Sequence, residues 1–245
     1  NLHRRVLRFV ARHLHAEDVA GQLLPGERRA VGVARHRDAS LLCVDFRNLD
    51  RLAGHYRGKA AVVRPHTKTH KSPRIAALQL ARGATGICVA KLSEAETMVD
   101  AGIEDVLITS GVVDPVRIRR AAALARRTPQ LRMVADHAAN VDALGAAAAA
   151  AGVTLRVLVD LDCGAHRSGS AMGPPAVALA VRVAEHPALA FDGFQAFASD
   201  VMHQDDYQTR RRAELAVLDQ VVATRHLAER AGLDVGIVSV GGTGT

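Results

Sequence analysis

The sequence predicts an α/β fold, namely a (β/α)8 TIM-type barrel that is truncated after its seventh strand. Short apolar runs rich in β-branched residues alternate with helical patterns along most of the chain. Strands joined by helical crossovers form a parallel sheet that is buried on both faces. No Gly-x-Gly-x-x-Gly motif follows the first strand, which argues against an open dinucleotide-binding sheet. Together these observations favour the barrel.

The chain begins with a region that we assign separately from the barrel. Residues 1–40 contain one predicted helix, Leu2 to His15, and a linker around Leu24-Pro25-Gly26. Residues 41–245 form the predicted barrel domain, which opens with a strand at Leu41–Phe46 and a helix from Leu49 to Tyr56.

Seven strands and six helices then follow in alternation. The predicted strands are Ala61–Val63, Gly86–Ala90, Asp105–Thr109, Leu131–Ala135, Leu155–Leu161, Phe191–Phe197 and Val235–Val240. The predicted helices are Arg74–Ala81, Ser93–Ala101, Pro115–Arg126, Ala138–Ala151, Pro175–Glu185 and Tyr207–Ala231. Within the second of these helices, Ser93 and Glu96 form a predicted capping box, and Ala101-Gly102 ends the helix.

A closed barrel of this type needs eight strands, and the sequence supplies seven barrel strands. The last of them is followed directly by Gly241-Gly242-Thr243-Gly244-Thr245. A domain that stops at a strand edge leaves backbone hydrogen-bonding groups unpaired. We therefore expect this chain to be a fragment with an incomplete barrel.

Composition narrows the class of protein. No run of eighteen apolar residues occurs, so we expect no membrane span. The formal charge of +7 comes with 3% aromatic residues and no long Lys/Arg block, so we expect no nucleic-acid partner. Cys43, Cys88 and Cys163 are widely spaced and form no Cys-x-x-Cys pair, which favours small buried side chains in a reducing, cytoplasmic compartment.

The stretch from Arg64 to Pro73, Arg-Pro-His-Thr-Lys-Thr-His-Lys-Ser-Pro, carries the strongest chemical signal. It follows an apolar run and precedes a helical pattern, so its lysines stand at the C-terminal end of a strand, where barrel enzymes hold their cofactors. A lysine amine crowded by other cations forms Schiff bases with aldehydes. The alternative is a basic, solvated loop with no chemical role.

Two further segments fall at the same edge of the predicted barrel. Asp162 to Gly169 contains Arg167, which could direct its guanidinium at a cofactor, or could brace the loop through an ion pair with Asp162. The glycines and threonines of 241–245 offer backbone N–H groups and hydroxyls to a phosphate. A Gly-rich tail without function is the alternative for that segment.

The motif Arg64-Pro65-His66-x-Lys68-x-His70-Lys71 resembles that of the D-serine dehydratase and D-threonine aldolase family of alanine racemase-like, fold-type III pyridoxal-phosphate enzymes. The resemblance runs from about residue 40 to 245. Its other matches are Gly86 to Glu96, Asp160 to Gly164 with Arg167-Ser168-Gly169, and Gly241 to Thr245.

The resemblance implies roles for individual residues. Lys68 would be the Schiff-base lysine, with Lys71 as the second choice. His66 would act with it in catalysis, and Arg64 would line the cofactor site. Arg167 would lie near the cofactor ring. The phosphate would be bound by Gly241, Gly242, Thr243, Gly244 and Thr245.

The sequence also departs from the family pattern. Phe197-Ala198-Ser199-Asp200 stands where the family usually has a tyrosine followed by a His-Gly pair, so a proton-relay hydroxyl is missing there. The family binds a divalent metal, zinc or manganese, through a C-terminal β-domain that the resemblance does not find in this sequence. His203, Asp205 and Asp206 lie on a loop entering a helix, and we predict no metal ligands among them.

The resemblance implies a pyridoxal-phosphate-dependent lyase that acts on β-hydroxy-D-amino acids, as an aldolase or a dehydratase. A racemase of the alanine racemase type and a non-catalytic barrel that binds the cofactor remain as alternatives. The implied partners are a small D-amino acid substrate and, since dimers are usual among such enzymes, a second copy of the chain.

Overall fold

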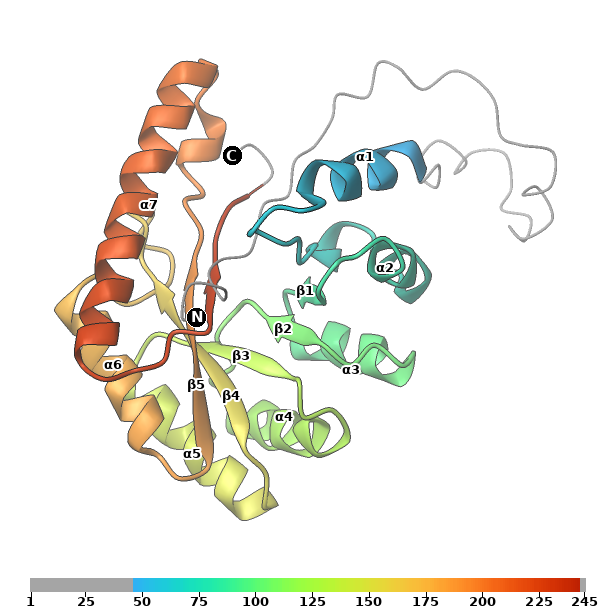
Figure 1. The fold of residues 1–245 in the computed structure, drawn as a ribbon. Coiled ribbons are helices and arrows are strands. Elements are labelled where there is room, and N and C mark those ends of the chain that lie inside the picture. The colour runs from blue at the N-terminus through green and yellow to red at the C-terminus, as the bar shows by residue number, and fades with distance from the viewer. Residues whose placement is uncertain (1–45, 243–245) are drawn as a thin grey trace, which may run out of the picture.

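The computed structural model describes residues 46–242, which form one curled sheet with helices on its outer side (Figure 1). All six strands of the sheet are parallel, and they follow one another in chain order. They are β1 (Ile87–Val89), β2 (Val106–Ile108), β3 (Arg132–Ala135), β4 (Leu155–Leu161), β5 (Leu189–Ala196) and β6 (Ile237–Ser239). The result is a half-barrel, which agrees with the predicted α/β class and with part of a TIM barrel.

Helices alternate with these strands, as the apolar periodicity predicts. They are α1 (Phe46–Tyr56), α2 (Pro73–Leu80), α3 (Leu92–Asp100), α4 (Pro115–Arg127), α5 (Ala138–Ala151), α6 (Pro174–Glu185) and α7 (Tyr207–Arg230). Two short 3-10 helices, η3 (Thr67–Thr69) and η4 (Val201–His203), lie after the first extended segment and after β5. No helix in residues 46–242 is long and apolar enough to cross a membrane.

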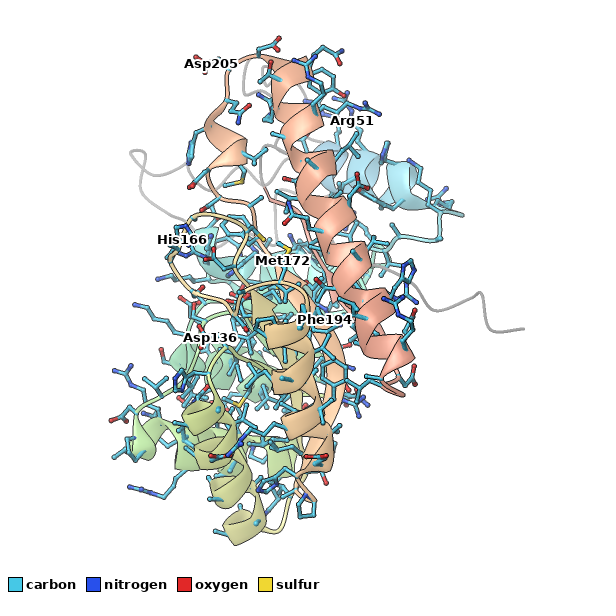
Figure 2. All side chains as sticks on the ribbon, turned by 90° about the vertical axis from the view of Figure 1, so that its left-hand side faces the viewer. Arg51, Asp136, His166, Met172, Phe194 and Asp205 are labelled. Carbon is cyan, nitrogen blue, oxygen red and sulfur yellow. The ribbon has the colours of Figure 1, made fainter. Side chains whose placement is uncertain are left out.

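The apolar core lies mainly between the outer face of the sheet and the helices. Figure 2 looks onto α6 and α7, with Phe194 of β5 labelled beside them, and this side chain is fully buried. The inner face carries a separate, smaller cluster made by Cys88, Leu107, Val134 and Leu158. Strands buried on both faces explain the continuous apolar runs that predicted them.

Most predicted elements are confirmed, and the boundaries of α5 are those predicted. The predicted strand at Ala61–Val63 is wrong: the chain pairs with β1 slightly later, through one parallel bridge between His66 and Cys88. Pro65 has no N–H to donate, so a regular ladder cannot continue through it. The predicted strand at 41–46 and the helix at 2–15 lie outside the described residues, except that Phe46 begins α1.

The predicted capping box of Ser93 and Glu96 is also wrong. α3 begins at Leu92, with Lys91 as N-cap and no side-chain cap bond from it. Glu94 occupies the third helical position instead, and its carboxylate accepts a hydrogen bond from the Ala90 N–H at 2.9 Å. A negative side chain in the first turn also suits the positive end of the helix.

One irregularity in the sheet bears on the barrel interior. The pairing of β4 with β5 shifts between Val157 and Leu158. Val157 pairs with Phe191 and Leu158 pairs with Gly193, so Asp192 is the extra residue. Such a bulge puts two neighbouring side chains on nearly the same face. Here it turns Asp192 toward arginines of β3 and β4.

We expect replacement by alanine to change the stability in opposite directions at two glycines, Gly152 and Gly54. Gly152 ends α5 at φ +64°, and a Cβ there would meet no atom within 4 Å, so Gly152→Ala adds only backbone strain, about 1–2 kcal/mol. Gly54 lies inside α1, where its φ is not positive, and a Cβ there would also meet no atom within 4 Å. We expect Gly54→Ala to stabilise by up to about 1 kcal/mol. Urea denaturation of both variants measures the two changes, and equal signs would contradict this account.

Candidate functional site

The C-terminal ends of the strands bring several predicted residues together. η3 follows the extended segment beside β1 and carries Lys68, whose side chain is exposed. Thr67, next to it, is fully buried, and its hydroxyl donates to the Cys88 carbonyl at 3.1 Å. Buried bonds thus fix the turn while the lysine amine stays accessible.

His66 is the N-cap of η3. Its Nδ1 accepts a hydrogen bond from the backbone N–H of Lys68 at 3.1 Å. The proton of the neutral ring is therefore on Nε2, which lies 3.1 Å from the Thr109 hydroxyl. That hydroxyl donates in turn to the Val89 carbonyl. The geometry makes His66 a support for the turn that bears Lys68.

Burial lowers the pKa of His66 to about 4, and the positive charge of Lys68 acts in the same direction, against a smaller raising effect of Glu94. His66 is thus neutral at pH 7. An imidazole with this pKa does not supply an imidazolium proton at neutral pH.

A pH-dependent stability follows from this shift. The folded pKa lies below the unfolded value of about 6.5, so between pH 6.5 and 4 the unfolded chain takes up a proton that the folded chain refuses. The free energy of unfolding should fall by about 2–3 kcal/mol as the pH drops through this window, and level off below it. Urea denaturation at pH 7 and 4.5 measures the loss.

His66→Asn is the matched variant for this measurement. Asparagine keeps an acceptor for the Lys68 N–H at the N-cap position but does not titrate. The variant should lose less stability than the natural protein between pH 7 and 4.5. An identical loss in both would assign the effect to other groups, such as His70, whose pKa is also lowered by burial.

Arg167 lies on the loop after β4, which folds back on the strand. Asp162 organises this loop by accepting from the Gly164 and His166 backbone N–H groups and contacting the His166 ring at 2.6 Å. Asp162 therefore braces the loop through His166, and the alternative Asp162–Arg167 ion pair does not form. Asp136 and His166 are labelled at this end of the sheet in Figure 2.

The ring of Phe197 lies close to the charged groups of both Lys68 and Arg167. The Nζ atom of Lys68 lies 5.7 Å from the centre of its ring, and the Cζ atom of Arg167 lies 5.3 Å from the same point. Both distances are within the range of cation–π attraction. A phenyl ring keeps this contact although it lacks the hydroxyl of the tyrosine usual in the family.

The segment after β6 reaches the same place. Gly241 has φ +95°, and a Cβ on Gly242 would overlap the Met202 sulfur and come within 2.7 Å of Phe197 Cε2. Only glycine permits this approach of the backbone to the ring. Thr243, Gly244 and Thr245, the remaining predicted phosphate ligands, lie outside the described residues.

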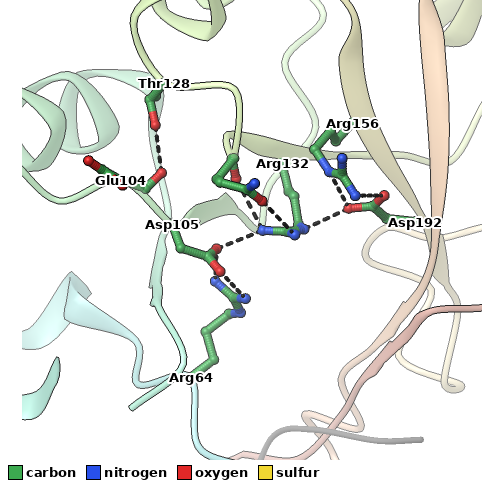
Figure 3. Close-up of polar contacts among 8 residues, drawn as sticks. Arg64, Glu104, Asp105, Thr128, Arg132, Arg156 and Asp192 are labelled. Atoms are coloured by element: carbon green, nitrogen blue, oxygen red, sulfur yellow. Dashed lines mark hydrogen bonds and ion pairs between the residues drawn. The ribbon is translucent and has the colours of Figure 1, made fainter. Parts of the chain in front are cut away.

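The structure does not bring Arg64 to this group, contrary to the expectation that it binds the cofactor. Its guanidinium is buried and makes a two-pronged ion pair with Asp105, which precedes β2 at the N-terminal edge of the sheet (Figure 3). Asp105 also contacts Arg132, which binds Asp192, and Asp192 contacts Arg156. Arg64 lies only two residues before His66, but its guanidinium is held by these ion pairs near the N-terminal ends of the strands. It therefore lies away from Lys68 and Arg167.

Lys71, the second choice for the cofactor lysine, faces a different neighbour. It adopts φ +47°, and its Nζ lies 3.4 Å from the Glu94 carboxylate of α3. Burial acts to raise the pKa of Glu94, but the Ala90 N–H and Lys71 outweigh it and lower that pKa. Lys71 is therefore engaged in an ion pair, which supports Lys68 as the reactive amine.

From the sequence alone, we assign no role to two buried polar residues at this edge, Asp160 of β4 and Gln195 of β5. Gln195 Nε2 donates to the Asp160 carboxylate at 2.9 Å and to the Thr109 carbonyl at 3.1 Å. Burial raises the pKa of Asp160, and the negative charge of Asp136 adds to the effect. Polar residues in otherwise apolar strands were the signal that could have found them.

No metal site stands out in this part of the chain. Across residues 46–242, no three His, Cys, Asp or Glu side chains are grouped so as to hold a metal ion. Asp206 instead caps α7 by accepting from the Thr209 N–H, and His203 and Asp205 are exposed.

The arrangement suits a phosphorylated aromatic aldehyde. It offers an accessible amine on a fixed turn, a guanidinium near the same ring, and a glycine backbone that approaches closely after β6. Pyridoxal phosphate needs these three elements, namely a lysine, a partner for the ring and a phosphate cradle. Lys68, Arg167, Gly241 and Gly242 could therefore hold it.

Known proteins agree with this reading. Residues 46–245 match the family described as alanine racemase, N-terminal domain. The chain is 34% identical over 200 residues to a 3-hydroxy-D-aspartate aldolase of Paracoccus denitrificans, covering 81% of this chain and 52% of the relative. It is 37% identical over 186 residues to a D-threonine aldolase of an Arthrobacter species, covering 75% and 48%.

A solved structure gives the same result. The D-threonine aldolase from Filomicrobium marinum superimposes with a TM-score of 0.79 at 38% identity, over 81% of this chain and 54% of that one. The chain spans about half the length of the curated relatives it matches. The resemblance inferred from the sequence is thus confirmed, and the chain belongs to the alanine racemase N-terminal domain family.

Proposed function

We propose that this protein is a pyridoxal-phosphate-dependent lyase acting on β-hydroxy-D-amino acids, with Lys68 as the lysine that holds the cofactor. The observation that carries the proposal is the convergence of Lys68 and Arg167 on Phe197 at the C-terminal edge of the strands. Active sites of such barrels lie at this edge. A bound aldehyde cofactor requires an accessible amine and gains from a guanidinium close to it.

The names of the relatives support the substrate class. They are a D-threonine aldolase, a 3-hydroxy-D-aspartate aldolase and a D-threo-3-hydroxyaspartate dehydratase. Each name denotes an amino acid with a hydroxyl on Cβ, and each reaction breaks a bond next to or at Cα. We propose the same class for this protein and leave the choice between aldolase and dehydratase to experiment.

When bound, pyridoxal phosphate supplies an electron sink for bonds at the substrate Cα. The protein's own residues would do the remaining work. Lys68 Nζ, on an exposed turn, is the group able to accept or return a proton beside Cα. Phe197 has no proton to move, and neutral His66 holds the turn. Arg167 would place its positive charge beside the cofactor ring, and the Gly241-Gly242 backbone would leave room for the phosphate.

We also propose a homodimer in the cytoplasm and a requirement for a divalent metal, zinc or manganese, on the strength of the family resemblance. The metal's ligands are not predicted among residues 46–242. Light scattering after gel filtration measures the oligomeric state. Activity after chelation, and after return of each metal separately, measures the requirement.

A substrate panel tests the proposed reaction. The protein loaded with pyridoxal phosphate is given D-threonine, 3-hydroxy-D-aspartate, D-serine or D-alanine, with and without divalent metal. An aldolase converts D-threonine to glycine and acetaldehyde, and a dehydratase converts D-serine to pyruvate and ammonia. We expect one of these product pairs and no reaction with L-threonine. Racemisation of alanine without either pair would overturn the lyase in favour of a racemase.

A further inference from the structure

Lys68 and Arg167 are exposed, long side chains, yet both lie against one ring. Long side chains in water keep many rotamers, so their convergence depends on how firmly the two turns that carry them are held. The turns come from distant parts of the sequence. What connects them is a chain of hydrogen bonds across β2, β5 and β4.

Thr109 is the junction of this chain. Its hydroxyl lies 3.1 Å from His66 Nε2, and His66 Nδ1 accepts from the Lys68 N–H. Its backbone carbonyl accepts a separate hydrogen bond from Gln195 Nε2. One residue at the end of β2 therefore contacts both the lysine turn and the interior of the barrel.

Gln195 has only one possible amide orientation. Both of its partners, the Thr109 carbonyl and the Asp160 carboxylate, are acceptors, so the NH2 group must face them. Its Oε1 then stays buried without a hydrogen-bond partner among the described residues, in a residue that is 7% exposed. A buried amide that leaves an acceptor unpaired is costly, which indicates that its two donated bonds are needed.

Asp160 completes the connection to the arginine loop. Its second carboxylate oxygen accepts from the Ser168 hydroxyl at 3.0 Å, directly after Arg167. Its backbone carbonyl accepts from the Ser170 N–H, and the Gly169 N–H is held by Asp136. These three bonds thus tie the C-terminal side of Arg167 to the ends of β3 and β4.

We propose that Thr109, Gln195 and Asp160 form a positioning network that holds the Lys68 turn and the Arg167 loop in register with each other. The proposal deepens the proposed function, since it assigns residues that prepare the cofactor site, but the network itself exists without cofactor. These residues act through others and touch no reacting atom. Their loss should loosen both turns and weaken cofactor binding.

Amide hydrogen exchange on the cofactor-free protein tests the network directly. Gln195→Leu removes both donated bonds, and we expect exchange to rise about tenfold in both segments 66–71 and 162–170, with α4 unchanged. Thr109→Val removes the hydroxyl but keeps the carbonyl, so exchange should rise in 66–71 alone. Thr109→Ser should restore protection, because serine keeps the hydroxyl. Thr97→Val is the matched control, since Thr97 is an exposed residue of α3 whose hydroxyl donates to the Ser93 carbonyl.

Cofactor binding gives the second readout. The dissociation constant for pyridoxal phosphate should rise about fivefold to tenfold in Thr109→Val and Gln195→Leu, the effect of one or two lost hydrogen bonds, and remain unchanged in Thr97→Val. Unchanged exchange in both segments would overturn the network even if the cofactor binds. Loosened segments in a protein that does not bind pyridoxal phosphate would support the network and refute the proposed function. If Gln195→Leu does not fold, the Thr109 pair decides the question.

Discussion

Lys68→Ala should abolish covalent attachment of pyridoxal phosphate, whereas Lys71→Ala should retain it. The two lysines are three positions apart in one motif, but the structure separates them. Lys68 extends from η3 toward Phe197, while Lys71 turns to the Glu94 carboxylate of α3. An ammonium held in an ion pair is a poor nucleophile, because attack requires the free amine. We expect catalytic activity to fall about a thousandfold or more in Lys68→Ala only.

The visible spectrum and mass spectrometry measure this difference. The natural protein and Lys71→Ala should show a band at roughly 410–430 nm that survives dialysis, because the protein holds the cofactor covalently. Reduction with borohydride should then add the cofactor mass to the peptide containing Lys68. Label on Lys71 in the natural protein, or a surviving band in Lys68→Ala, would show that the assignment is wrong. Arg74→Ala, a cation on the adjoining α2, controls for loss of local charge.

The fold could be predicted largely because its elements are regular. Ala138–Ala151 is an alanine-rich helix closed by glycine, and the structure gives it the predicted bounds. The strands could be located because a parallel strand buried on both faces reads as an unbroken apolar run. Lys68 and Arg167 could be placed at one edge, because C-terminal ends of parallel strands share that edge, and the structure brings both to Phe197.

What could not be predicted depends on side-chain direction and on irregular backbone. Arg64 and His66 lie two residues apart on one extended segment. Only the structure shows that Arg64 forms an ion pair with Asp105 at the N-terminal edge of the sheet, away from the candidate site. The bulge at Asp192 interrupts the regular alternation of side chains between the two faces of the sheet, and a sequence-based prediction of side-chain direction depends on that alternation. The contacts of Gln195 with Thr109 and Asp160 join β5, β4 and the residue that follows β2, and no local pattern encodes them.

We expect the largest effect on stability from the ionic layer that holds Arg64, in which Arg64, Arg132 and Asp192 are buried and Asp105 and Arg156 are partly exposed. The three arginines of this layer, Arg64, Arg132 and Arg156, pair with two carboxylates, Asp105 and Asp192, so the five charged groups carry a formal charge of +1 (Figure 3). Asp192 is 6% exposed and accepts from Arg132 at 2.6 Å and from Arg156 at 2.8 Å. Asp192→Asn keeps the shape but raises the charge to +2 and leaves two guanidinium groups facing one amide. We expect it to cost about 3–5 kcal/mol.

Arg132→Met gives the contrasting result that identifies the cause. It removes the arginine shared by both aspartates and leaves two separate pairs, Arg64 with Asp105 and Arg156 with Asp192, in a neutral layer. Methionine fills much of the same volume, so this variant should lose clearly less stability than Asp192→Asn, although it deletes as many ion pairs. Urea denaturation at pH 7 compares the two, with Asp142→Asn as a control from an exposed pair with Arg182. Equal losses in both buried variants would mean that the number of contacts, and not the balance of buried charge, determines the stability of this layer.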